Sequence, residues 1–393
     1  MKAVILAAGE GKRLRPFTET LPKVMLPVAN KPIINHVVDS LEKTGIDEII
    51  IVVGYKKEVI MDYFKDYKTI KISFITQEKQ LGTAHALLQA KKKIKGSFLV
   101  IPGDNIIDNK SITNLIEDKS KYSLLIKEHS HPSKYGVVFT EKGKLKKIVE
   151  KPKEEIGKFI STGIYKFPKN VFKRIEELAK KGVYALTSTI SSILDEENIN
   201  TIIADQWMDI VFPWDLLSVN ETMIHSIKSS KSGTIEKNVE IKGNVSIGKD
   251  TKIYSGCYIV GPVTIGKNCE IGPNVCIFPS TSIANNSVIH PFTEVRNSVI
   301  MENVHVGSNS FVNNSVVSKG TVVNNNFSTS SGKKHAVIEE ECREIENIGV
   351  LIAEDCVIND HVVTDPGIII GRKCEIDSMK RIRKNIESNT KVM

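Results

Sequence analysis

Hydrophobic residues in the first half of the chain follow two alternating patterns. Short runs rich in Val, Ile and Phe predict strands, and the stretches between them carry apolar residues at helical spacing. The order strand, helix, strand predicts a mostly parallel sheet with helices on both faces and functional loops at the carboxyl ends of its strands. The predicted strands are Lys2–Ala7, Glu48–Val53, Lys71–Ile75 and Phe98–Ile101, and the predicted helices are Ile33–Lys43, Lys57–Asp66 and Thr83–Lys93.

The second half of the chain repeats with a different period. One aliphatic residue recurs every six positions, and Gly248, Gly266 and Gly272 each follow one of them. A period of six fits neither an α-helix nor an amphipathic strand, and it is typical of a β-helix in which each face of a coil buries one aliphatic side chain. The series comprises Ile235, Ile241, Ile247, Ile253, Ile259, Ile265, Ile271, Ile277, Ile283, Ile289 and Val295.

The repeat is interrupted further along. Its phase shifts after Val295, and a charged segment at about 331–348 predicts an excursion from the coils or a helix. Ile352 resumes the period, with Thr364 in one of the later aliphatic positions. The basic tail after Ser378 is expected to fray or to dock as a short helix.

Length and composition favour a two-domain protein. A chain of 393 residues exceeds one ordinary core, and Gly- and Ser-bearing sequence at Ser229–Gly233 predicts domains at 1–228 and 229–393. The net charge of +8 is spread rather than gathered on one face, which argues against a nucleic-acid partner. No apolar run approaches a membrane span, and the N-terminal run Ala3–Ala8 is too short for a signal peptide. Six cysteines without Cys-x-x-Cys spacing favour reduced thiols and a cytoplasmic location over a zinc site.

The segment from Leu6 to Lys23 carries the first candidate chemistry. Gly9 and Gly11 allow a tight turn whose amides can face an anion, and Arg13 and Lys23 are cations suited to a triphosphate. Viewed alone, Gly-x-Gly can also be an ordinary turn. A Rossmann loop would need a third glycine and an acidic residue after the second strand, and a Walker loop would end in Gly-Lys-Ser/Thr. Neither pattern is present here.

Gly-x-Gly-x-Arg followed by Pro-Lys resembles the signature of the sugar-1-phosphate nucleotidylyltransferases, which join a sugar 1-phosphate to a nucleoside triphosphate. The resemblance covers nearly the whole chain, since many members end in a left-handed β-helix. It is strongest to glucose-1-phosphate thymidylyltransferases and to archaeal bifunctional N-acetylglucosamine-1-phosphate uridylyltransferases. It implies an α/β Rossmann-like nucleotidyltransferase domain followed by an all-β left-handed parallel β-helix of hexapeptide repeats. One departure is Lys12, where the family usually has Thr or Ser.

The resemblance also implies a nucleotide site. Gln77 can pair with the imide edge of a pyrimidine, which favours UTP or dTTP. Viewed alone, the stretch QEKQLGTAHA is equally well a polar strand end followed by a helix N-cap at Thr83. His85 is expected to pack or to lie on the helix surface. The nucleotide-binding residues that the resemblance implies are Leu6, Ala8, Gly9, Gly11, Gln77, Gly82 and Thr83.

Two aspartates are the expected metal ligands. Asp104 in VIPGDNI follows an apolar strand and a glycine, and Asp209 in WMDI is the second acid. The family's ligands at these positions hold Mg²⁺ together with triphosphate oxygens, which is how proteins usually bind this ion. Asp108 and Asp205 are near neighbours that could be mistaken for them.

Three motifs resemble the family's sugar-phosphate pocket, namely Tyr135-Gly136, Glu150-Lys151 and Thr162-Gly163. The binding residues that the resemblance implies are Gly136, Glu150, Lys151 and Thr162. Glu150 could accept hydrogen bonds from sugar hydroxyls and Lys151 could pair with the phosphate, although a surface Glu-Lys pair before a proline is also common. Ser161 stands where uridylyltransferase members often carry Asn, which weakens the case for an N-acetylated sugar.

The expected chemistry follows from charge. A sugar phosphate must attack the α-phosphorus of another polyanion, so cations and in-line positioning are required and no protein nucleophile is needed. We assign Arg13 to the β- and γ-phosphates and Lys23 to the α-phosphate or the sugar phosphate. A non-catalytic regulatory subunit is an alternative, but such proteins usually lose residues of this set, and here the set is intact.

The second domain could be a second enzyme. Related bifunctional proteins use the β-helix as an acetyltransferase that needs a His and a Tyr in one coil. Ser308 and Phe311 occupy those positions in an ungapped comparison, although a shifted alignment could bring in His305 and Lys333. Ser cannot act as a general base as His can, so we favour a structural role in a homo-oligomer, most simply a trimer.

Overall fold

The computed structural model describes residues 1–338 and 341–393, with side chains described for 1–335 and 344–393. The chain forms two compact units, which are described separately. The first unit comprises Met1–Glu10, Leu21–Met25 and Ile33–Asp209, and the second comprises Gly11–Thr20, Leu26–Pro32 and Ile210–Met393. The domain boundary between residues 228 and 229 stays a prediction.

The first unit is an α/β domain built on a nine-stranded mixed sheet in the order β5-β4-β1-β6-β11-β8-β12-β10-β9. Its strands are β1 (Lys2–Ala7), β4 (Glu48–Val53), β5 (Lys71–Thr76), β6 (Phe98–Pro102), β8 (Tyr122–Glu128), β9 (Gly136–Glu141), β10 (Lys144–Glu150), β11 (Phe159–Phe167) and β12 (Ile199–Ile203). Its helices are α1 (Ile33–Glu42), α2 (Lys57–Phe64), α3 (Thr83–Gln89), α4 (Asn109–Glu117), α5 (Val171–Ala179) and α6 (Leu186–Leu194).

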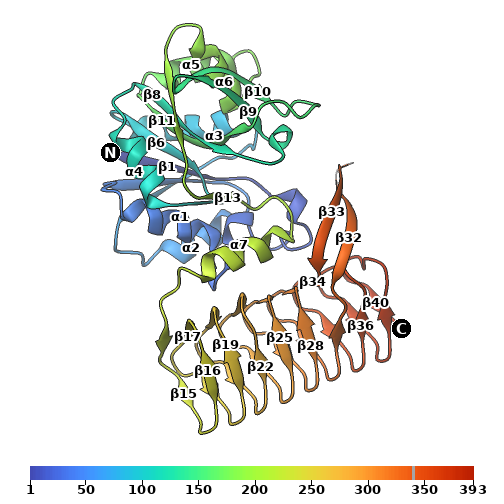
Figure 1. Ribbon diagram of the computed structural model, residues 1–393. Helices are drawn as coiled ribbons and strands as arrows, with labels where there is room; N and C mark the ends of the chain where they lie inside the picture. Colours follow the sequence, from blue (N-terminus) through green and yellow to red (C-terminus); the bar gives the residue numbers. More distant parts are fainter. Residues whose placement is uncertain (339–340) are drawn as a thin grey trace. The chain divides into compact units, whose positions relative to one another are not determined.

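Helices cover both faces of this sheet (Figure 1). Successive residues of β1 point to opposite faces, so Val4 packs in one core with α3, α5 and α6, and Ile5 packs in the other with α1, α2 and α4. Every residue of β4 is buried, as expected of a parallel strand covered on both sides. The predicted strands and helices are all present, and their bounds differ by a few residues at the carboxyl ends.

The expectation of a mostly parallel sheet holds for only part of it. Strands β5, β4, β1 and β6 are parallel neighbours, but β11 runs antiparallel to β6 and β8, and β10 runs antiparallel to β12 and β9. The four strands predicted from hydrophobic runs form one parallel group, and β8 and β12 form a further parallel pair. Of the predicted sugar-phosphate residues, Gly136, Glu150 and Thr162 lie in the strands with antiparallel neighbours, β9, β10 and β11.

The second unit contains the β-helix, a regular stack of coils (Figure 1). Each coil contributes a strand to three parallel sheets, and side chains such as Ile253, Ile271 and Ile289 stack 18 residues apart. The first sheet comprises β14 (Ser230–Lys231), β17 (Val245–Ile247), β20 (Val263–Ile265), β23 (Thr281–Ile283), β26 (Val299–Ile300), β29 (Val316–Val317), β34 (Val350–Ile352) and β37 (Ile368–Ile370).

The other two sheets complete the coil. One comprises β15 (Thr234–Ile235), β18 (Lys252–Ile253), β21 (Glu270–Ile271), β24 (Val288–Ile289), β27 (His305–Val306), β30 (Val322–Val323), β35 (Val357–Ile358), β38 (Glu375–Ile376) and β40 (Lys391–Val392). The last comprises β16 (Glu240–Lys242), β19 (Tyr258–Val260), β22 (Cys276–Ile277), β25 (Glu294–Arg296), β28 (Phe311–Asn313), β31 (Ser328–Thr329), β36 (Val363–Thr364) and β39 (Arg381–Ile382). The β-helix predicted from the six-residue period, which the family resemblance implies is left-handed and parallel, is confirmed.

Local sequence explains the tight corners between the strands. Asn268, Asn286 and Asn303 have φ values of 54°, 59° and 57°, in the left-handed region that Asn tolerates better than most residues. The repeated aliphatic side chains point inward and form one continuous core from Val245 to Ile382. The corners therefore come from the polar positions of the repeat, and the core comes from its aliphatic positions.

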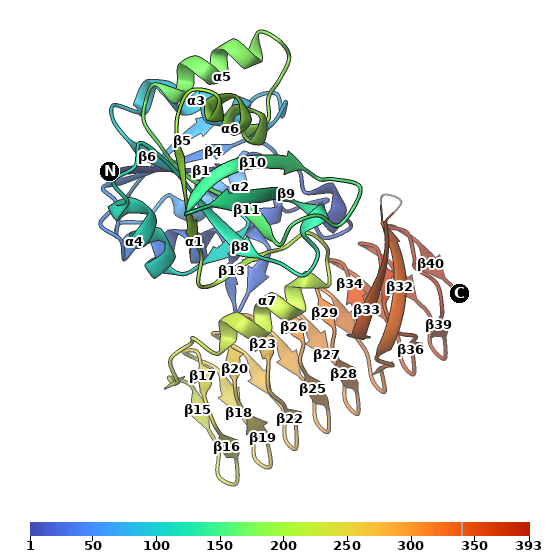
Figure 2. The same ribbon diagram turned by 45° about the horizontal axis from the view of Figure 1, so that its top comes forward.

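The phase shift after Val295 arises because the coils there are one residue shorter than the earlier ones. Ile283 pairs with Ile300, and Val295 with Val312, so these coils contain 17 residues. The excursion is an antiparallel hairpin of β32 (Gly332–Ile338) and β33 (Glu341–Ile348), which stands out from the coils in Figure 2. The alternative of a helix there was wrong.

The expectation for the tail was also wrong. After Ser378 the chain does not fray or form a helix: β39 and β40 continue two of the sheets, and Ile382 is buried. The basic residues of this segment alternate with inward-facing aliphatic residues, and that alternation supplies the last coil.

Helix α7 (Asp215–Ile224) has five buried residues, and one of them, Asn220, is polar and hydrogen-bonds to the coils. Its Oδ1 accepts hydrogen bonds from the Ala29 amide at 2.9 Å and the Ser282 hydroxyl at 2.8 Å, and its Nδ2 donates to the Ser280 carbonyl at 2.8 Å. Asn220→Ala leaves three buried polar groups without their hydrogen-bond partner. Each such group lowers the free energy of unfolding by about 1–3 kcal/mol. We expect the thermal midpoint to fall by several degrees in calorimetry, whereas Glu221→Ala, at an exposed position on the same helix, should leave it unchanged.

Candidate active site

The carboxyl ends of the four parallel strands define the candidate site. Ala8 follows β1, Gln77 follows β5, and Gly103 and Asp104 follow β6. The ends are drawn together by backbone hydrogen bonds from the Gly103 amide to the Leu6 carbonyl at 2.9 Å and from the Tyr55 amide to the Ala8 carbonyl at 3.1 Å. The structure therefore brings Leu6, Ala8, Gln77 and Asp104 to one edge of the sheet, where open α/β sheets bind ligands.

Gly54 is a residue of this edge that sequence reasoning missed. A Cβ there would lie 2.7 Å from the Ala8 carbonyl oxygen and 2.7 Å from Nε2 of Gln80. Only glycine allows β1 and the loop after β4 to approach this closely. The signal was available, because Gly54 directly follows the predicted second strand.

The glycine loop turns at Gly11, whose φ of 69° is in the left-handed region. The Gly11 carbonyl accepts the Leu14 amide at 3.0 Å and the Thr18 hydroxyl at 2.9 Å, which closes the short 3-10 turn η1 (Lys12–Leu14). Gly11 and Arg13 belong to the second compact unit, and Gly9 to the first. Lys12 is exposed, so the departure from the family pattern does not disturb the turn.

The expected base-binding residues lie where β5 meets α3. Gln77 is buried, and its Nε2 lies 2.8 Å from Nδ1 of His85 and 3.3 Å from the Gly82 carbonyl. His85 is therefore a hydrogen-bond partner of Gln77, whereas packing or a position on the helix surface was expected. Thr83 does not cap α3: Gly82 occupies the N-cap position, and the Thr83 hydroxyl accepts the Leu186 amide at 3.1 Å. A Cβ at Gly82 would lie 2.5 Å from the Tyr184 carbonyl, so a side chain does not fit there.

The two expected metal ligands are tied together by a small antiparallel ladder. Asp104 directly precedes β7 (Asn105–Ile107), and Asp209 is the last residue of β13 (Trp207–Asp209). Asp209 pairs with Asn105, and the buried Trp207 indole donates to Asn105 Oδ1 at 3.2 Å. This register places the two aspartates at the same end of the ladder, although they are far apart in sequence.

The donor set suits Mg²⁺. This ion usually takes one or two protein carboxylates and completes its shell with water and phosphate oxygens. Among residues whose side chains are described, no group of three or more His, Cys, Asp or Glu is arranged to hold a metal. Asp104 forms an ion pair with Lys23, and the two side chains are 26% and 17% exposed. Lys23 begins the short 3-10 turn η2 (Lys23–Met25), which holds this cation at the carboxylate.

The two competing aspartates have structural roles. Asp108 is the N-cap of α4 and accepts the Ser111 amide at 2.8 Å and the Gln206 amide at 2.9 Å. Burial acts to raise the pKa of Asp108, but these hydrogen bonds outweigh it and the pKa is lowered. Asp205 pairs with Lys110 at 2.7 Å. Both carboxylates are therefore occupied without a metal.

Three of the four expected sugar-phosphate residues meet at the open end of the β9–β10 hairpin. Gly136 pairs with Glu150, and the Lys151 amide donates to the Tyr135 carbonyl at 3.0 Å. A Cβ at Gly136 would lie 3.3 Å from Glu150 Oε2, so the glycine leaves the carboxylate room. Thr162 is different: it is buried, and its hydroxyl donates to the Leu125 carbonyl at 2.8 Å within the sheet.

Tyr135 lies in the Tyr135-Gly136 motif expected at the sugar-phosphate pocket, but nothing in the sequence indicates what its side chain contacts. Its hydroxyl donates to Asp209 Oδ1 at 2.9 Å. The side chain therefore reaches from the expected sugar-phosphate hairpin to an expected metal ligand.

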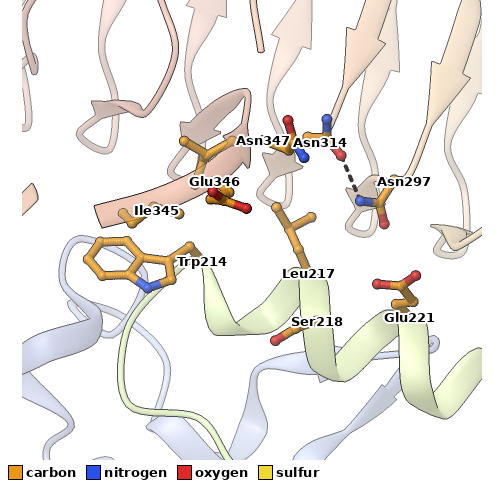
Figure 3. A pocket seen from close by; sticks show the side chains of 10 residues that line it. Trp214, Leu217, Ser218, Glu221, Asn297, Asn314, Ile345, Glu346 and Asn347 are labelled. Carbon is orange, nitrogen blue, oxygen red and sulfur yellow. Dashed lines mark hydrogen bonds between the residues drawn. The ribbon is translucent and has the colours of Figure 1, made fainter. Parts of the chain in front are cut away.

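A separate cavity of about 470 Å³ lies in the second unit, among α7, two coil corners and the hairpin (Figure 3). None of the predicted site residues lines it. Its lining residues are Trp214, Leu217, Ser218, Glu221, Asn297, Asn314, Ile345, Glu346, Asn347 and Ile348.

The sheet edge and the paired aspartates are typical of a nucleotide-binding α/β domain, and the coils of the second unit form a left-handed β-helix. The family model described as "Nucleotidyl transferase" matches residues 2–226, and that of the "GMPPB C-terminal domain" matches residues 259–348. The chain belongs to the nucleotidyl transferase family. None of the helices in the described part of the chain has the length and hydrophobicity needed to cross a bilayer.

Similarity to known relatives extends over the whole chain. It is 35% identical to the "Bifunctional protein GlmU" of Methanocaldococcus jannaschii, covering 99% of this chain and 97% of that one. It is also 35% identical to the "Bifunctional sugar-1-phosphate nucleotidylyltransferase/acetyltransferase" of Sulfurisphaera tokodaii, covering 96% of each. A putative glucose-1-phosphate thymidylyltransferase from Bacillus anthracis, solved with sucrose, superimposes with a TM-score of 0.54 at 28% identity, covering 59% of this chain and 98% of that one.

Proposed function

We propose that this protein transfers a nucleotidyl group from UTP or dTTP to a hexose 1-phosphate, such as glucose 1-phosphate, and releases pyrophosphate. The observation that carries the proposal is the β7–β13 ladder, which holds Asp104 and Asp209 together at the sheet edge where Ala8 and Gln77 lie. Family membership and the names of the relatives support nucleotide-sugar synthesis as the activity.

The reaction forms one bond and breaks one. An oxygen of the sugar phosphate attacks the α-phosphorus, and the bond from that phosphorus to the β-phosphate bridging oxygen breaks, so pyrophosphate departs with both electrons. Arg13 binds the β- and γ-phosphates, and Lys23 binds the α-phosphate or the sugar phosphate, which lowers the repulsion between two polyanions. Asp104 and Asp209 hold Mg²⁺, which supplies further positive charge for the phosphate oxygens.

We favour a plain hexose over an N-acetylated one because of a single residue, Ser161. Ser161, where uridylyltransferases often have Asn, is buried, and its hydroxyl lies 3.0 Å from that of Tyr165. Burial raises the pKa of Tyr165 to about 12, so this pair stays neutral at physiological pH. Glu150, at the end of β10, accepts hydrogen bonds from sugar hydroxyls, and Lys151 pairs with the phosphate.

The test is a grid of reactions with Mg²⁺ present. Pyrophosphate release is measured for each nucleoside triphosphate, including UTP, dTTP, GTP and ATP, with each of several hexose 1-phosphates. We expect turnover with a pyrimidine nucleotide and glucose 1-phosphate or a close analogue. If no combination releases pyrophosphate, the proposed activity is wrong, and if a purine nucleotide is preferred, the role given to Gln77 is wrong.

Base selection can be tested at Gln77. In Gln77→Leu, the leucine side chain is close in size to glutamine and suits this buried position. The substitution removes the amide that would pair with the base. Losing such hydrogen bonds costs about 1–3 kcal/mol, so we expect kcat/KM for the preferred nucleotide to fall about 10- to 100-fold. Discrimination against CTP should weaken as well. Gln206→Leu, at an exposed position, is the matched control and should keep wild-type selectivity.

A second function for the β-helix is favoured only by the names of relatives. Two of the relatives compared above are described as bifunctional. The coil residues argue for assembly instead. The backbone amide of Ser308 donates a hydrogen bond to Asn325 Oδ1 at a corner, and Phe311 is half-buried in β28. Neither side chain can act as a general base. Incubation with acetyl-CoA and glucosamine 1-phosphate should release no thiol, and thiol release at enzymatic rates would establish the bifunctional alternative.

The proposed assembly is a homotrimer formed through the β-helix. Outward-facing aromatic side chains on one sheet support it: Tyr258 contacts Phe278 edge-on, and the Arg296 guanidinium lies 4.1 Å from the Phe278 ring centre. Aromatic and Arg side chains are enriched at interfaces. The proposed location is the cytoplasm, which suits the free thiols of the five described cysteines.

A further inference from the structure

Tyr135 contacts an expected metal ligand although it is not itself one of the expected ligands. It follows the short 3-10 turn η4 (Pro132–Lys134), and its hydroxyl lies 2.9 Å from Oδ1 of Asp209. An ionised carboxylate only accepts hydrogen bonds, so the phenol is the donor. An ionised carboxylate has about four lone-pair positions, and this bond occupies one of them.

The direction of this hydroxyl is fixed by neighbouring rings. His129 contacts the Tyr135 ring edge-on at 4.9 Å between ring centres, and Trp207 does so at 5.7 Å. Trp207 is itself held, because its indole donates to the buried Asn105. A phenol packed between two anchored rings loses little further freedom when it orients a partner.

The backbone of Tyr135 belongs to the β9–β10 hairpin, where the sugar phosphate is expected to bind. Its carbonyl accepts the Lys151 amide at 3.0 Å, and the next residue, Gly136, pairs with Glu150 across the β9–β10 hairpin. One residue thus has its main chain fixed to the expected sugar-phosphate hairpin and its side chain fixed to an expected metal ligand.

We infer that Tyr135 is a positioning residue, which holds the Asp209 carboxylate in the orientation that binds the metal and links that orientation to the acceptor hairpin. The inference rests on the proposed function, since it takes Asp209 as a metal ligand. Hydrogen-bond partners that orient a ligand typically contribute 10- to 100-fold in metal affinity or activity. Without the Tyr135 hydroxyl, the Asp209 side chain samples more rotamers. Metal binding must then fix the rotamer that Tyr135 would otherwise hold.

The test is Tyr135→Phe, which keeps the ring and removes only the hydroxyl. Mn²⁺ binding is measured by electron paramagnetic resonance in the presence of an α,β-methylene nucleoside triphosphate that cannot react. We expect about tenfold weaker Mn²⁺ binding and an unchanged thermal midpoint. Turnover at low Mg²⁺ should fall and should recover substantially at saturating Mg²⁺, a pattern that a merely structural defect would not give.

Tyr63→Phe is the matched control. Its hydroxyl also donates a hydrogen bond, to Asn35 Oδ1 at 3.2 Å, between α2 and α1. It should bind Mn²⁺ as the wild type does. If Tyr135→Phe also retains wild-type Mn²⁺ affinity, the inference is overturned.

Asp209→Asn separates this inference from the proposed function. If Asp209→Asn loses Mn²⁺ binding while Tyr135→Phe keeps it, only the role of Tyr135 is wrong. If Asp209→Asn itself binds Mn²⁺ as tightly as the wild type, the metal assignment of the proposed function fails, and the role of Tyr135 fails with it.

Discussion

Asp104→Asn should lower turnover about a thousandfold and leave the fold unchanged. The substitution keeps the size of the side chain but removes the charge that would hold Mg²⁺ against the triphosphate. Asp104 is partly exposed and is not part of a buried hydrogen-bond network, so the thermal midpoint should stay within about one degree of the wild type. The measurement is steady-state pyrophosphate release, with calorimetry on the same preparation.

Asp205→Asn is the matched control for this change. It removes the same charge a few residues from Asp209, at an exposed position that pairs with Lys110. Its turnover should stay within about twofold of the wild type. Activity retained by Asp104→Asn would contradict the metal assignment, and equal losses in both variants would point to a general effect of charge.

Lys23→Met is expected to change metal binding and turnover in opposite directions. Without nucleotide, the Lys23 ammonium is paired with Asp104 and competes with any cation for that carboxylate. Removing it should tighten Mn²⁺ binding a few-fold, since the pair is partly exposed and screened by water. With substrates bound, the same ammonium is the cation assigned to the reacting phosphates, so kcat should fall about 100-fold.

The two readouts together make this prediction specific. Mn²⁺ binding is followed by titration without nucleotide, and kcat by pyrophosphate release. Lys57→Met is the control, because that lysine also pairs with a carboxylate, Glu78, at 3.7 Å, but lies in α2. Weaker Mn²⁺ binding in Lys23→Met would show that Lys23 supports the metal site rather than competing with it.

The regular parts of both units were predictable because they follow from local patterns. The runs at Lys2–Ala7 and Glu48–Val53 matched β1 and β4 to the residue, since buried parallel strands are almost entirely apolar. The six-residue period predicted the coils because each aliphatic side chain occupies an equivalent position in the stack. The last coil was missed because its polar residues concealed Ile382, its buried aliphatic residue.

The candidate site was predictable as a set of residues, but its geometry was not. Motif order suggested Asp104 and Asp209, whereas their proximity depends on the pairing of β7 with β13, two short strands separated by about a hundred residues. Nothing local in the sequence indicates such a pairing. The contact of Tyr135 with Asp209 could not be predicted for the same reason, because the two residues are 74 positions apart.

The most direct test of the central claim is to follow which phosphate joins the sugar. The enzyme is incubated with Mg²⁺, glucose 1-phosphate and UTP or dTTP carrying radioactive phosphorus at either the α or the γ position. Attack at the α-phosphorus predicts that α-label appears in the nucleotide sugar and γ-label appears in pyrophosphate. Recovery of γ-label in a sugar bisphosphate or in orthophosphate would contradict nucleotidyl transfer as the activity of this protein.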